Sequence, residues 1–292
     1  MKERTIYALG FFDGVHLGHQ ALLQACRELS RLHGCKAGAV TFTSHPDALV
    51  SGTAPALLNT SEDRKQLLLA YGMEHIAEIP FDKTVMSTLW EDFLQGLVAR
   101  GAAGFVCGED FRFGAGGLGT AKKLAAFCEE QNLPYAVVPE QIMDAERISS
   151  TRIRQLLENG QPEQATHLLG HPHILTGTVC SGKQLGRTIG IPTANLTFPA
   201  GILVPKFGVY ACKVHMDGRA YMAVTNVGTR PTVDGVGITA EAHILDFDGD
   251  LYDREITLAF CNFLRPEKKF DSLEALKAQI AEDIGKTRSV FK

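Results

Sequence analysis

The chain has 292 residues, a formal net charge of −4, and 45% hydrophobic against 21% charged residues. This composition is typical of a globular protein, and the length suggests two domains. No apolar run is long enough to span a bilayer, and neither half has the basic excess of a non-specific nucleic-acid binder. We expect no signal peptide, because strand-like sequence begins almost at once. We therefore expect neither a membrane nor a nucleic-acid partner, but a protein that handles small molecules. We further expect a monomer or a weak homo-oligomer, although the sequence does not show the oligomeric state.

The seven cysteines form no Cys-x-x-Cys pair. Cys26, Cys107 and Cys128 lie among apolar neighbours, which predicts buried free thiols. An odd number of unpaired cysteines favours a reducing compartment, so we expect the protein in the cytoplasm.

The first half of the chain alternates strand-like and helix-like stretches. Residues 5–9 and 36–42 predict short apolar strands, and the apolar spacing over residues 19–32 predicts a helix between them. Further apolar segments follow at residues 67–69, 76–79, 105–107 and 135–138. This order predicts a parallel sheet with helices on its faces, with a ligand beyond the carboxyl ends of the strands.

A boundary between two domains is expected near residue 170. Two short helices are predicted over residues 153–169, and Pro172 in Gly170-His171-Pro172 resists any further helix. We therefore divide the chain into domains 1–170 and 171–292.

The second domain is rich in short β-segments. Residues 210–216 and 219–225 flank Asp217-Gly218, a strong hairpin signal. Residues 240–245 and 255–263 predict a second hairpin, with Asp248-Gly249 in its turn. Several short strands separated by turns predict a small antiparallel barrel.

The chain is expected to end in an amphipathic helix. Asp271 is the predicted N-cap, with Glu274 three residues on. Its apolar face is predicted to consist of Leu273, Leu276, Ile280 and Ile284.

The most informative segment of the first domain joins the first strand to the first helix and reads Gly-Phe-Phe-Asp-Gly-Val-His-Leu-Gly-His over residues 10–19. The backbone N–H groups at a helix N-terminus attract anions, and Gly14 and Gly18 let the backbone approach a phosphate. His16 and His19 can donate hydrogen bonds to phosphate oxygens. The alternative is that these histidines cap the helix or form half of a metal site.

Two further segments of the first domain fit phosphate chemistry. Ser150 and Thr151 suit a helix N-cap, and Arg152 suits a triphosphate. The loop over residues 108–114 contains Asp110 and Phe111 within Gly-Glu-Asp-Phe-Arg-Phe-Gly. The alternatives are an ordinary capped surface helix and a glycine-rich turn with two packed aromatic rings.

The second domain contains a glycine-rich segment over residues 182–195. Its glycines, together with Lys183 and Arg187, can wrap a polyphosphate, and Thr193 and Asn195 offer oxygen ligands for Mg²⁺. Composition alone also allows an ordinary glycine-rich turn. Glu241, farther on, would by itself be read as a solvated residue of a strand.

Together these segments resemble the bifunctional riboflavin kinase/FAD synthetases of bacteria. In the first domain the resemblance is to the His-x-Gly-His and Ser-Ser-Thr-x-Ile-Arg motifs of nucleotidyltransferases and to the Gly-x-Asp-Phe-x-Phe-Gly loop of their flavin branch. In the second it is to the Gly-Arg-x-x-Gly-x-Pro-Thr-Ala-Asn signature of riboflavin kinases. It implies an α/β plus β fold: a Rossmann-like nucleotidyltransferase domain, then a small antiparallel β-barrel kinase domain.

The resemblance implies phosphorylation of riboflavin by ATP to FMN and ADP, then adenylylation of FMN by ATP to FAD and pyrophosphate. Catalysis would fall to Glu241 as the kinase base and to His16, His19 and Arg152 in adenylyl transfer, with Mg²⁺ on Thr193 and Asn195. Substrate-binding residues would be Gly10, Phe12, Asp13, Gly14, Gly18, Asp110, Phe111, Ser150, Thr151, Gly182, Lys183, Gly186, Arg187, Pro192, Asn226 and Arg230.

Three positions in the first domain depart from the family pattern. Phe11 replaces a polar residue, Ser44 replaces a proline, and Gly117 stands where a basic residue is common. The alternatives are therefore a riboflavin kinase with a weak or inactive first domain, or a flavin- or nucleotide-binding regulator without turnover.

Overall fold

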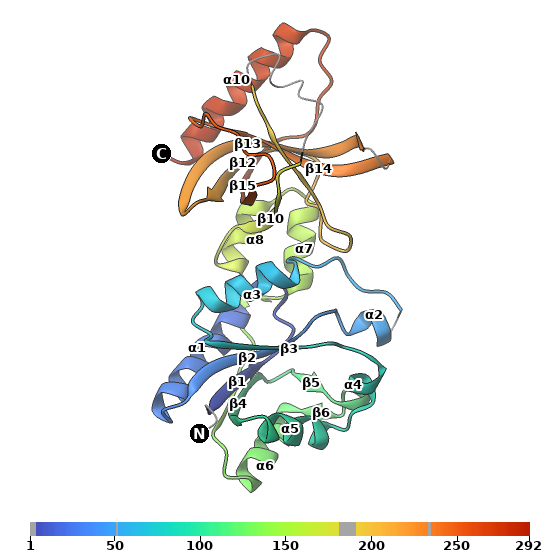
Figure 1. Ribbon diagram of the computed structural model, residues 1–292, viewed down its shortest axis with the longest axis vertical. Helices are drawn as coiled ribbons and strands as arrows, with labels where there is room; N and C mark the ends of the chain where they lie inside the picture. Colours follow the sequence, from blue (N-terminus) through green and yellow to red (C-terminus); the bar gives the residue numbers. More distant parts are fainter. Residues whose placement is uncertain (1–3, 51, 181–190, 233–234) are drawn as a thin grey trace. The chain divides into compact units, whose positions relative to one another are not determined.

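The computed structural model describes residues 4–50, 52–180, 191–232 and 235–292, and the side chains of residues 230–236 lie outside this description. The chain divides into two compact units, Met1–Ser150 and Thr151–Lys292 (Figure 1). Within the described ranges, we find no helix with the length and apolar character needed to cross a membrane.

The first unit is built on a five-stranded parallel sheet with the order β3-β2-β1-β4-β7 (Figure 1). Its strands are β1 (Thr5–Leu9), β2 (Lys36–Phe42), β3 (His75–Ile79), β4 (Ala102–Gly108) and β7 (Tyr135–Val138). Its main helices are α1 (Leu17–Leu32), α3 (Ser61–Ala70), α5 (Trp90–Ala99) and α6 (Ala121–Glu130). The predicted parallel sheet is confirmed, except that residues 67–69 belong to helix α3.

Strand β1 shows why both faces of this sheet are covered. All five of its residues are buried. Ile6 packs with residues of α1 and α3 on one face, whereas Tyr7 packs with residues of α5 and α6 on the other. Successive side chains of a strand point to opposite faces, so a strand this apolar needs helices on both sides.

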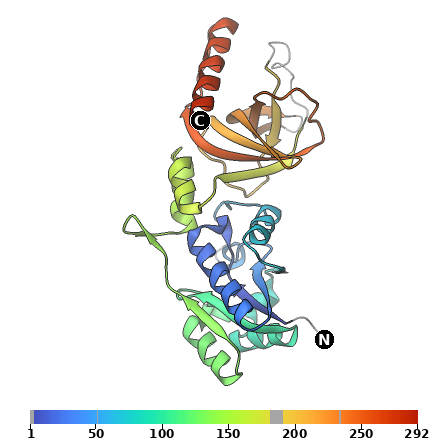
Figure 2. The ribbon, with the colours of Figure 1, turned by 90° about the vertical axis from the view of Figure 1, so that its left-hand side faces the viewer.

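Short elements complete the first unit. These are α2 (Asp47–Val50), α4 (Lys83–Ser87), the 3-10 turns η1 (Asp13–Val15) and η2 (Ala115–Gly117), and the strand pairs β5 (Arg112–Phe113) with β6 (Gly119–Thr120) and β8 (Ile142–Met143) with β9 (Glu146–Arg147). Figure 2 shows the β8–β9 hairpin projecting from the body of its unit.

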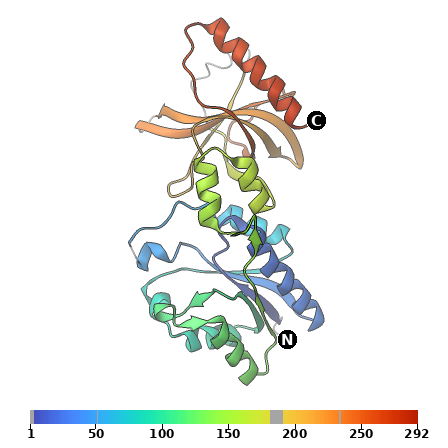
Figure 3. The same ribbon diagram turned by 180° about the vertical axis from the view of Figure 1, so that it is seen from behind.

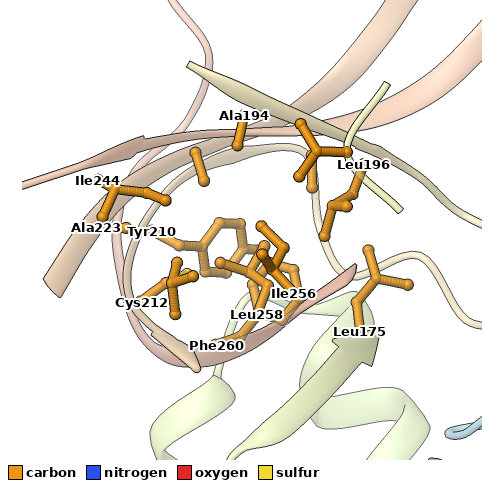
Figure 4. Packing of buried hydrophobic residues seen from close by; sticks show 14 of the residues in the cluster. Leu175, Ala194, Leu196, Tyr210, Cys212, Ala223, Ile244, Ile256, Leu258 and Phe260 are labelled. Carbon is orange, nitrogen blue, oxygen red and sulfur yellow. The ribbon is translucent and has the colours of Figure 1, made fainter. Parts of the chain in front are cut away.

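The second unit contains a nearly closed six-stranded antiparallel barrel with the order β10-β15-β12-β13-β14-β11. Its strands are β10 (His173–Thr178), β11 (Ala194–Thr197), β12 (Gly208–Met216), β13 (Arg219–Thr232), β14 (Gly235–Ile244) and β15 (Glu255–Arg265). A bridge between Cys180 and Asn195 joins the chain after β10 to the other edge strand. Tyr210 lies within the barrel core, where its ring meets that of Phe260 edge-on (Figure 4).

The Asp217-Gly218 hairpin is confirmed, because both residues adopt left-handed φ angles of 48° and 71° between β12 and β13. The second predicted hairpin is wrong. β14 pairs with β13 and β11, whereas β15 pairs with β12 and β10. The connection carries apolar side chains, among them Phe247 and Leu251, that pack on the barrel core, so it covers the barrel instead of reversing a strand.

The described residues of this part of the chain include the helices α7 (Ser150–Glu158), which begins at the last residue of the first unit, α8 (Pro162–Leu169) and α10 (Leu273–Val290) (Figure 3). α8 ends at Gly170, whose φ of 75° is left-handed, and its Glu163 accepts a hydrogen bond from Phe263 N of β15. The predicted helices over residues 153–169 are therefore confirmed, and α8 packs on the barrel.

The predicted cap of the last helix is wrong by one residue. Ser272, in an extended conformation, accepts the hydrogen bond from Ala275 N, so Asp271 lies outside the helix. The predicted apolar face also needs correction: Leu273 is exposed, while Asp283 and Thr287 are buried. The buried side of α10 thus includes polar groups, which the helical hydrophobic periodicity alone predicts to be exposed to solvent.

Candidate active sites

The loop between β1 and α1 takes an unusual path. Phe12, Gly14 and Val15 have positive φ angles of 60°, 80° and 41°. The buried ring of Phe12 packs directly against Gly10, where a Cβ atom would lie 3.1 Å from it. Left-handed backbone is costly for non-glycine residues, so the rest of the unit must hold this loop in place.

Three hydrogen bonds from distant parts of the first unit hold the loop. The carboxylate of Asp13 accepts one from Leu58 N at 2.8 Å. Thr41 Oγ1 donates to Phe11 O at 2.9 Å, and Ser150 Oγ donates to Asp13 O at 2.9 Å. Asp13 and Ser150, both predicted to bind substrate, are therefore brought together and also serve as anchors of the loop.

The two histidines lie together at the start of α1. His16 is the N-cap, and its Nδ1 accepts a hydrogen bond from His19 N at 3.3 Å. Their rings are stacked, with centroids 3.7 Å apart, and a Cβ on Gly18 would touch the His16 ring at 3.1 Å. Gly18 thus leaves space for the stacked pair, and the capping role that we considered for these histidines is present in His16.

His19 is held neutral. Burial lowers its pKa well below the usual value, and the positive charges of His16, Arg147 and Arg64 lower this pKa further. Its Nδ1 is buried and meets no hydrogen-bond partner among the residues that the structure describes. A buried polar atom without a partner is costly, so this nitrogen has capacity for a ligand.

Arg64, on α3, is a residue of this site that the sequence analysis missed. It is fully buried, and its guanidinium lies 4.4 Å from the centroid of the Phe11 ring. Nη2 donates to Phe42 O at 2.7 Å, whereas the buried Nε and Nη1 have no hydrogen-bond partner within the described ranges. Phe11, a departure from the family pattern, thus contacts a buried cation, and Arg64 lies close enough to His19 to lower its pKa.

The Gly-Glu-Asp-Phe-Arg-Phe-Gly loop lies at β5. Asp110 forms an ion pair with Arg147, which also binds Glu140 at 2.7 Å. Phe111 and Phe113 are stacked with centroids 5.4 Å apart, as expected for two packed aromatic rings. The positive charge of Arg147 also lowers the pKa of His19, so the partner of Asp110 acts electrostatically on one of the two histidines.

Two other predicted residues of the adenylyl site, Thr151 and Arg152, fall in the first turn of α7, on the second unit's side of the division. Ser150, one residue earlier, is the member of this motif whose contact with the histidine loop is described.

In the second unit, three predicted residues stand side by side on adjacent strands. Asn195 of β11 pairs with Glu241 of β14, which pairs with Asn226 of β13. Ala240 and Ala242, the neighbours of Glu241, belong to the barrel core, so Glu241 points to the other face. Glu241 is nevertheless only 6% exposed, which contradicts the interpretation of it as a solvated residue.

The polypeptide before β11 is held against this row. His243 Nδ1 lies 2.9 Å from Pro192 O, and Asn195 Nδ2 donates to Thr193 O at 3.4 Å. At the other end of the row, Asn226 Nδ2 donates to Glu267 Oε1 at 3.2 Å. Four predicted residues, Gly182, Lys183, Gly186 and Arg187, lie outside the described residues, as does the side chain of Arg230.

The oxygen atoms at this row suit a hard cation. Among the described residues there is no group of three or more His, Cys, Asp or Glu side chains that could hold a metal by themselves. Thr193, Asn195 and Glu241 instead offer a hydroxyl, an amide and a carboxylate. Such a set fits Mg²⁺ that arrives with phosphates and completes its shell with water.

Comparison with known proteins assigns a different family model to each half of the chain. The model described as FAD synthetase matches residues 1–152, and the model described as riboflavin kinase matches residues 169–291.

Individual relatives match along the whole length. The chain is 34% identical to the bifunctional riboflavin kinase/FMN adenylyltransferase of Listeria monocytogenes, over 98% of this chain and 92% of the relative. It is 35% identical to the protein of that name from Escherichia coli, over 99% and 94%. A crystal structure of a protein named macrolide-efflux protein, from Streptococcus pneumoniae, is 30% identical, with a TM-score of 0.88 over 99% of this chain and 95% of that one.

Proposed function

Because the chain belongs to the bifunctional riboflavin kinase/FMN adenylyltransferase family, we propose that it converts riboflavin to FMN and then FMN to FAD, with one ATP in each step. The kinase reaction belongs to the second unit and releases ADP, and adenylyl transfer belongs to the first unit and releases pyrophosphate. The observation that carries this proposal is the presence of two chemically different sites, each within the range of its own family model.

In the kinase reaction Glu241 is the general base. As the 5′-hydroxyl oxygen of riboflavin bonds to the γ-phosphorus of ATP, the hydroxyl proton passes to the carboxylate and the bond to ADP breaks. The burial of Glu241 keeps competing water away from the carboxylate, and the flanking Asn195 and Asn226 offer amides to the substrates.

Thr193 and Asn195 would hold Mg²⁺ together with the phosphates of ATP. When bound there, Mg²⁺ supplies charge neutralisation for the transferred phosphoryl group. The contact between His243 and Pro192 O fixes the segment that carries both ligands. The glycine-rich segment before it would wrap the phosphates through Gly182, Lys183, Gly186 and Arg187, with Arg230 as a further cation.

In adenylyl transfer the first unit orients its substrates. An oxygen of the FMN phosphate attacks the α-phosphorus of ATP, and the bond to pyrophosphate breaks, so no proton has to be removed from the nucleophile. His16 and His19 donate hydrogen bonds to the phosphate oxygens, and the glycines of the loop admit the triphosphate. Arg152 and Thr151 contribute a cation and a hydroxyl from the first turn of α7.

The cellular setting follows from the thiols. All seven cysteines are free, and four of them, Cys26, Cys107, Cys128 and Cys212, are buried. Free thiols persist where the medium is reducing, which supports the cytoplasm as the site of the reaction. The partners are the small-molecule substrates, and the protein acts as a monomer or a weak homo-oligomer without nucleic acid.

The test is incubation of the purified protein with riboflavin, ATP and Mg²⁺, followed by chromatography of the flavins. We expect FAD, with FMN as an intermediate, and no product when Mg²⁺ is chelated. Accumulation of FMN alone would mean that the first unit binds without reacting. Unchanged riboflavin would leave a binding protein without turnover.

A further inference from the structure

Glu267 reaches the kinase row from outside the barrel ladder. It lies two residues beyond the end of β15, and its Oε1 accepts a hydrogen bond from Asn226 Nδ2 at 3.2 Å. The carboxylate passes over the backbone of Gly228, where any Cβ atom would overlap with it. Gly228 therefore lets the carboxylate come close to Asn226.

The backbone that presents Glu267 is tied to α10. Arg265 donates two hydrogen bonds to Asp283 Oδ2, from Nε at 3.0 Å and from Nη2 at 2.9 Å, and Asp283 is only 1% exposed. Arg265 Nη1 also donates to Pro266 O at 3.1 Å. Bidentate Arg–carboxylate pairs are both strong and directional, so residues 265–267 are held firmly although the Glu267 side chain is exposed.

The contact decides which way the Asn226 amide points. A carboxylate only accepts hydrogen bonds, so the NH₂ group must face Glu267 and Oδ1 must face away from it. Asn226 stands directly opposite Glu241, and the Cβ atoms of such cross-strand pairs lie about 5 Å apart. The row therefore runs amide, carboxylate, amide, carboxylate: Asn195, Glu241, Asn226, Glu267.

A hydroxyl group both donates and accepts hydrogen bonds, so a polyhydroxy chain matches this alternation of donors and acceptors. We propose that Glu267 is a positioning residue of the kinase: it fixes the Asn226 amide, which in turn orients the ribityl chain of riboflavin beside Glu241. The inference rests on the proposed kinase function and adds to it a residue that acts through another side chain.

The first experiment compares Glu267→Ala with Glu255→Ala in the full-length protein. Glu255 is an exposed glutamate at the first residue of β15, the strand that Glu267 follows, which makes it a matched control. For Glu267→Ala we expect kcat/KM for riboflavin to fall about tenfold, as for loss of a hydrogen bond to a charged group, with the KM for ATP within about twofold of wild type. Riboflavin binding, followed by quenching of its fluorescence, should weaken in parallel.

A double-mutant cycle separates positioning from a general structural role. If Glu267 acts through Asn226, the double variant Asn226→Ala/Glu267→Ala should be no worse than Asn226→Ala alone. Glu267→Gln should recover part of the lost activity, because its amide oxygen can still accept from Asn226. Additive losses, or a normal kcat/KM for Glu267→Ala, would overturn the proposal.

Two controls keep the outcomes apart. Thermal unfolding should be unchanged in Glu267→Ala, and adenylylation of added FMN should continue at the wild-type rate. If the wild-type protein neither bound nor phosphorylated riboflavin, the kinase assignment itself would be wrong. If the wild type did both and the Glu267 variants behaved like Glu255→Ala, only the role of Glu267 would be refuted.

Discussion

The two sites of this chain are held in place by different means. In the histidine loop of the first unit, Phe12, Gly14 and Val15 have left-handed backbone conformations. The loop depends on hydrogen bonds from residues far away in sequence. The row of the second unit lies on adjacent strands, where the ladder itself fixes Asn195, Glu241 and Asn226. The backbone hydrogen bonds of the sheet fix the positions of residues on adjacent strands, whereas a strained loop needs additional hydrogen bonds from other segments to hold its residues in place.

The chemistry differs in the same way. In the first site burial and nearby positive charges hold the imidazole of His19 neutral, whereas the second site holds the buried carboxylate of Glu241, which we propose as the proton acceptor. Loss of the proton acceptor removes a chemical step, but loss of one donor weakens only one of several contacts. The second site should therefore be the more sensitive to a single conservative change.

The largest effect is expected for Glu241→Gln. Gln keeps the shape of the side chain but cannot take the proton, so the rate of FMN formation should fall by on the order of 10²- to 10⁴-fold. The apparent affinity for riboflavin should change little, because the loss belongs to the transition state. Steady-state kinetics with riboflavin and, separately, with FMN as substrate would measure this. Near-normal FMN production would leave the kinase without a base.

His16→Ala and His19→Ala come next. Each should lower FAD formation by roughly 10²-fold, the effect of losing one oriented donor to developing charge, while FMN formation stays unchanged. Chromatography of the flavins formed from added FMN is the measurement. Equal losses of both activities would show that the histidines are structural or that the two sites are not separate.

A buried histidine of the barrel links the stability of the second unit to pH. His173 is 1% exposed and stacks on Phe260 in the barrel, and burial, with His171 nearby, lowers its pKa to about 3. The unfolded chain, with a pKa of about 6.5, binds the proton first, so stability is intact above pH 6.5 and falls as the pH drops toward 3. We expect a loss of about 2 kcal/mol between pH 7 and pH 5.

This loss can be measured by urea unfolding at both pH values, with hydrogen exchange localised to the barrel strands. His173→Phe should remove this part of the pH dependence, whereas His215→Gln, at an exposed position of β12, should leave it in place. An unchanged pH dependence in His173→Phe would show that other groups cause it.

The smallest effect is expected for Arg64→Met. The variant loses a buried cation, two of whose nitrogens meet no hydrogen-bond partner among the described residues, and replacing a buried charge with an apolar side chain is often neutral for stability. FAD formation should fall about tenfold because the positive potential beside His19 is lost, while FMN formation should not change. Thermal unfolding together with the two flavin assays would test this. An unfolded variant would instead show that Arg64 supports the loop.

The sequence predicted what is local. The strand and helix pattern of the two sheets, the Asp217-Gly218 turn and the position of the histidine loop between β1 and α1 follow from residues that are neighbours in the chain, and these structural predictions hold. The backbone path of the histidine loop, in contrast, is fixed by residues far away in sequence. The Asp248-Gly249 prediction was wrong because a turn signal does not say which strands pair: β14 and β15 are not neighbours in the barrel, and Phe247 of their connection packs on the barrel core. The register of a barrel is a long-range property, which a turn dipeptide does not encode.

The sequence analysis missed Arg64 and Glu267 because their contacts are also long-range. Arg64 meets Phe11 across 53 positions of sequence, and Glu267 meets Asn226 across 41. Neither has a local pattern that distinguishes it from a surface charge on a helix or loop. Glu241 was identified by family resemblance alone. Its burial could not be predicted from the sequence, because it depends on which segments cover its face of β14.

The buried thiols have a consequence for the life of the enzyme in the cell. Burial raises the pKa of Cys107 and Cys128 to about 12 and also raises the pKa of Cys212. The thiolate is the form that oxidants attack, and at neutral pH it is almost absent at such sites. Reduced flavins pass electrons to oxygen and produce peroxide, so an enzyme that handles flavins is exposed to that oxidant. The buried cysteines of both units remain protonated thiols, the form that reacts least with peroxide.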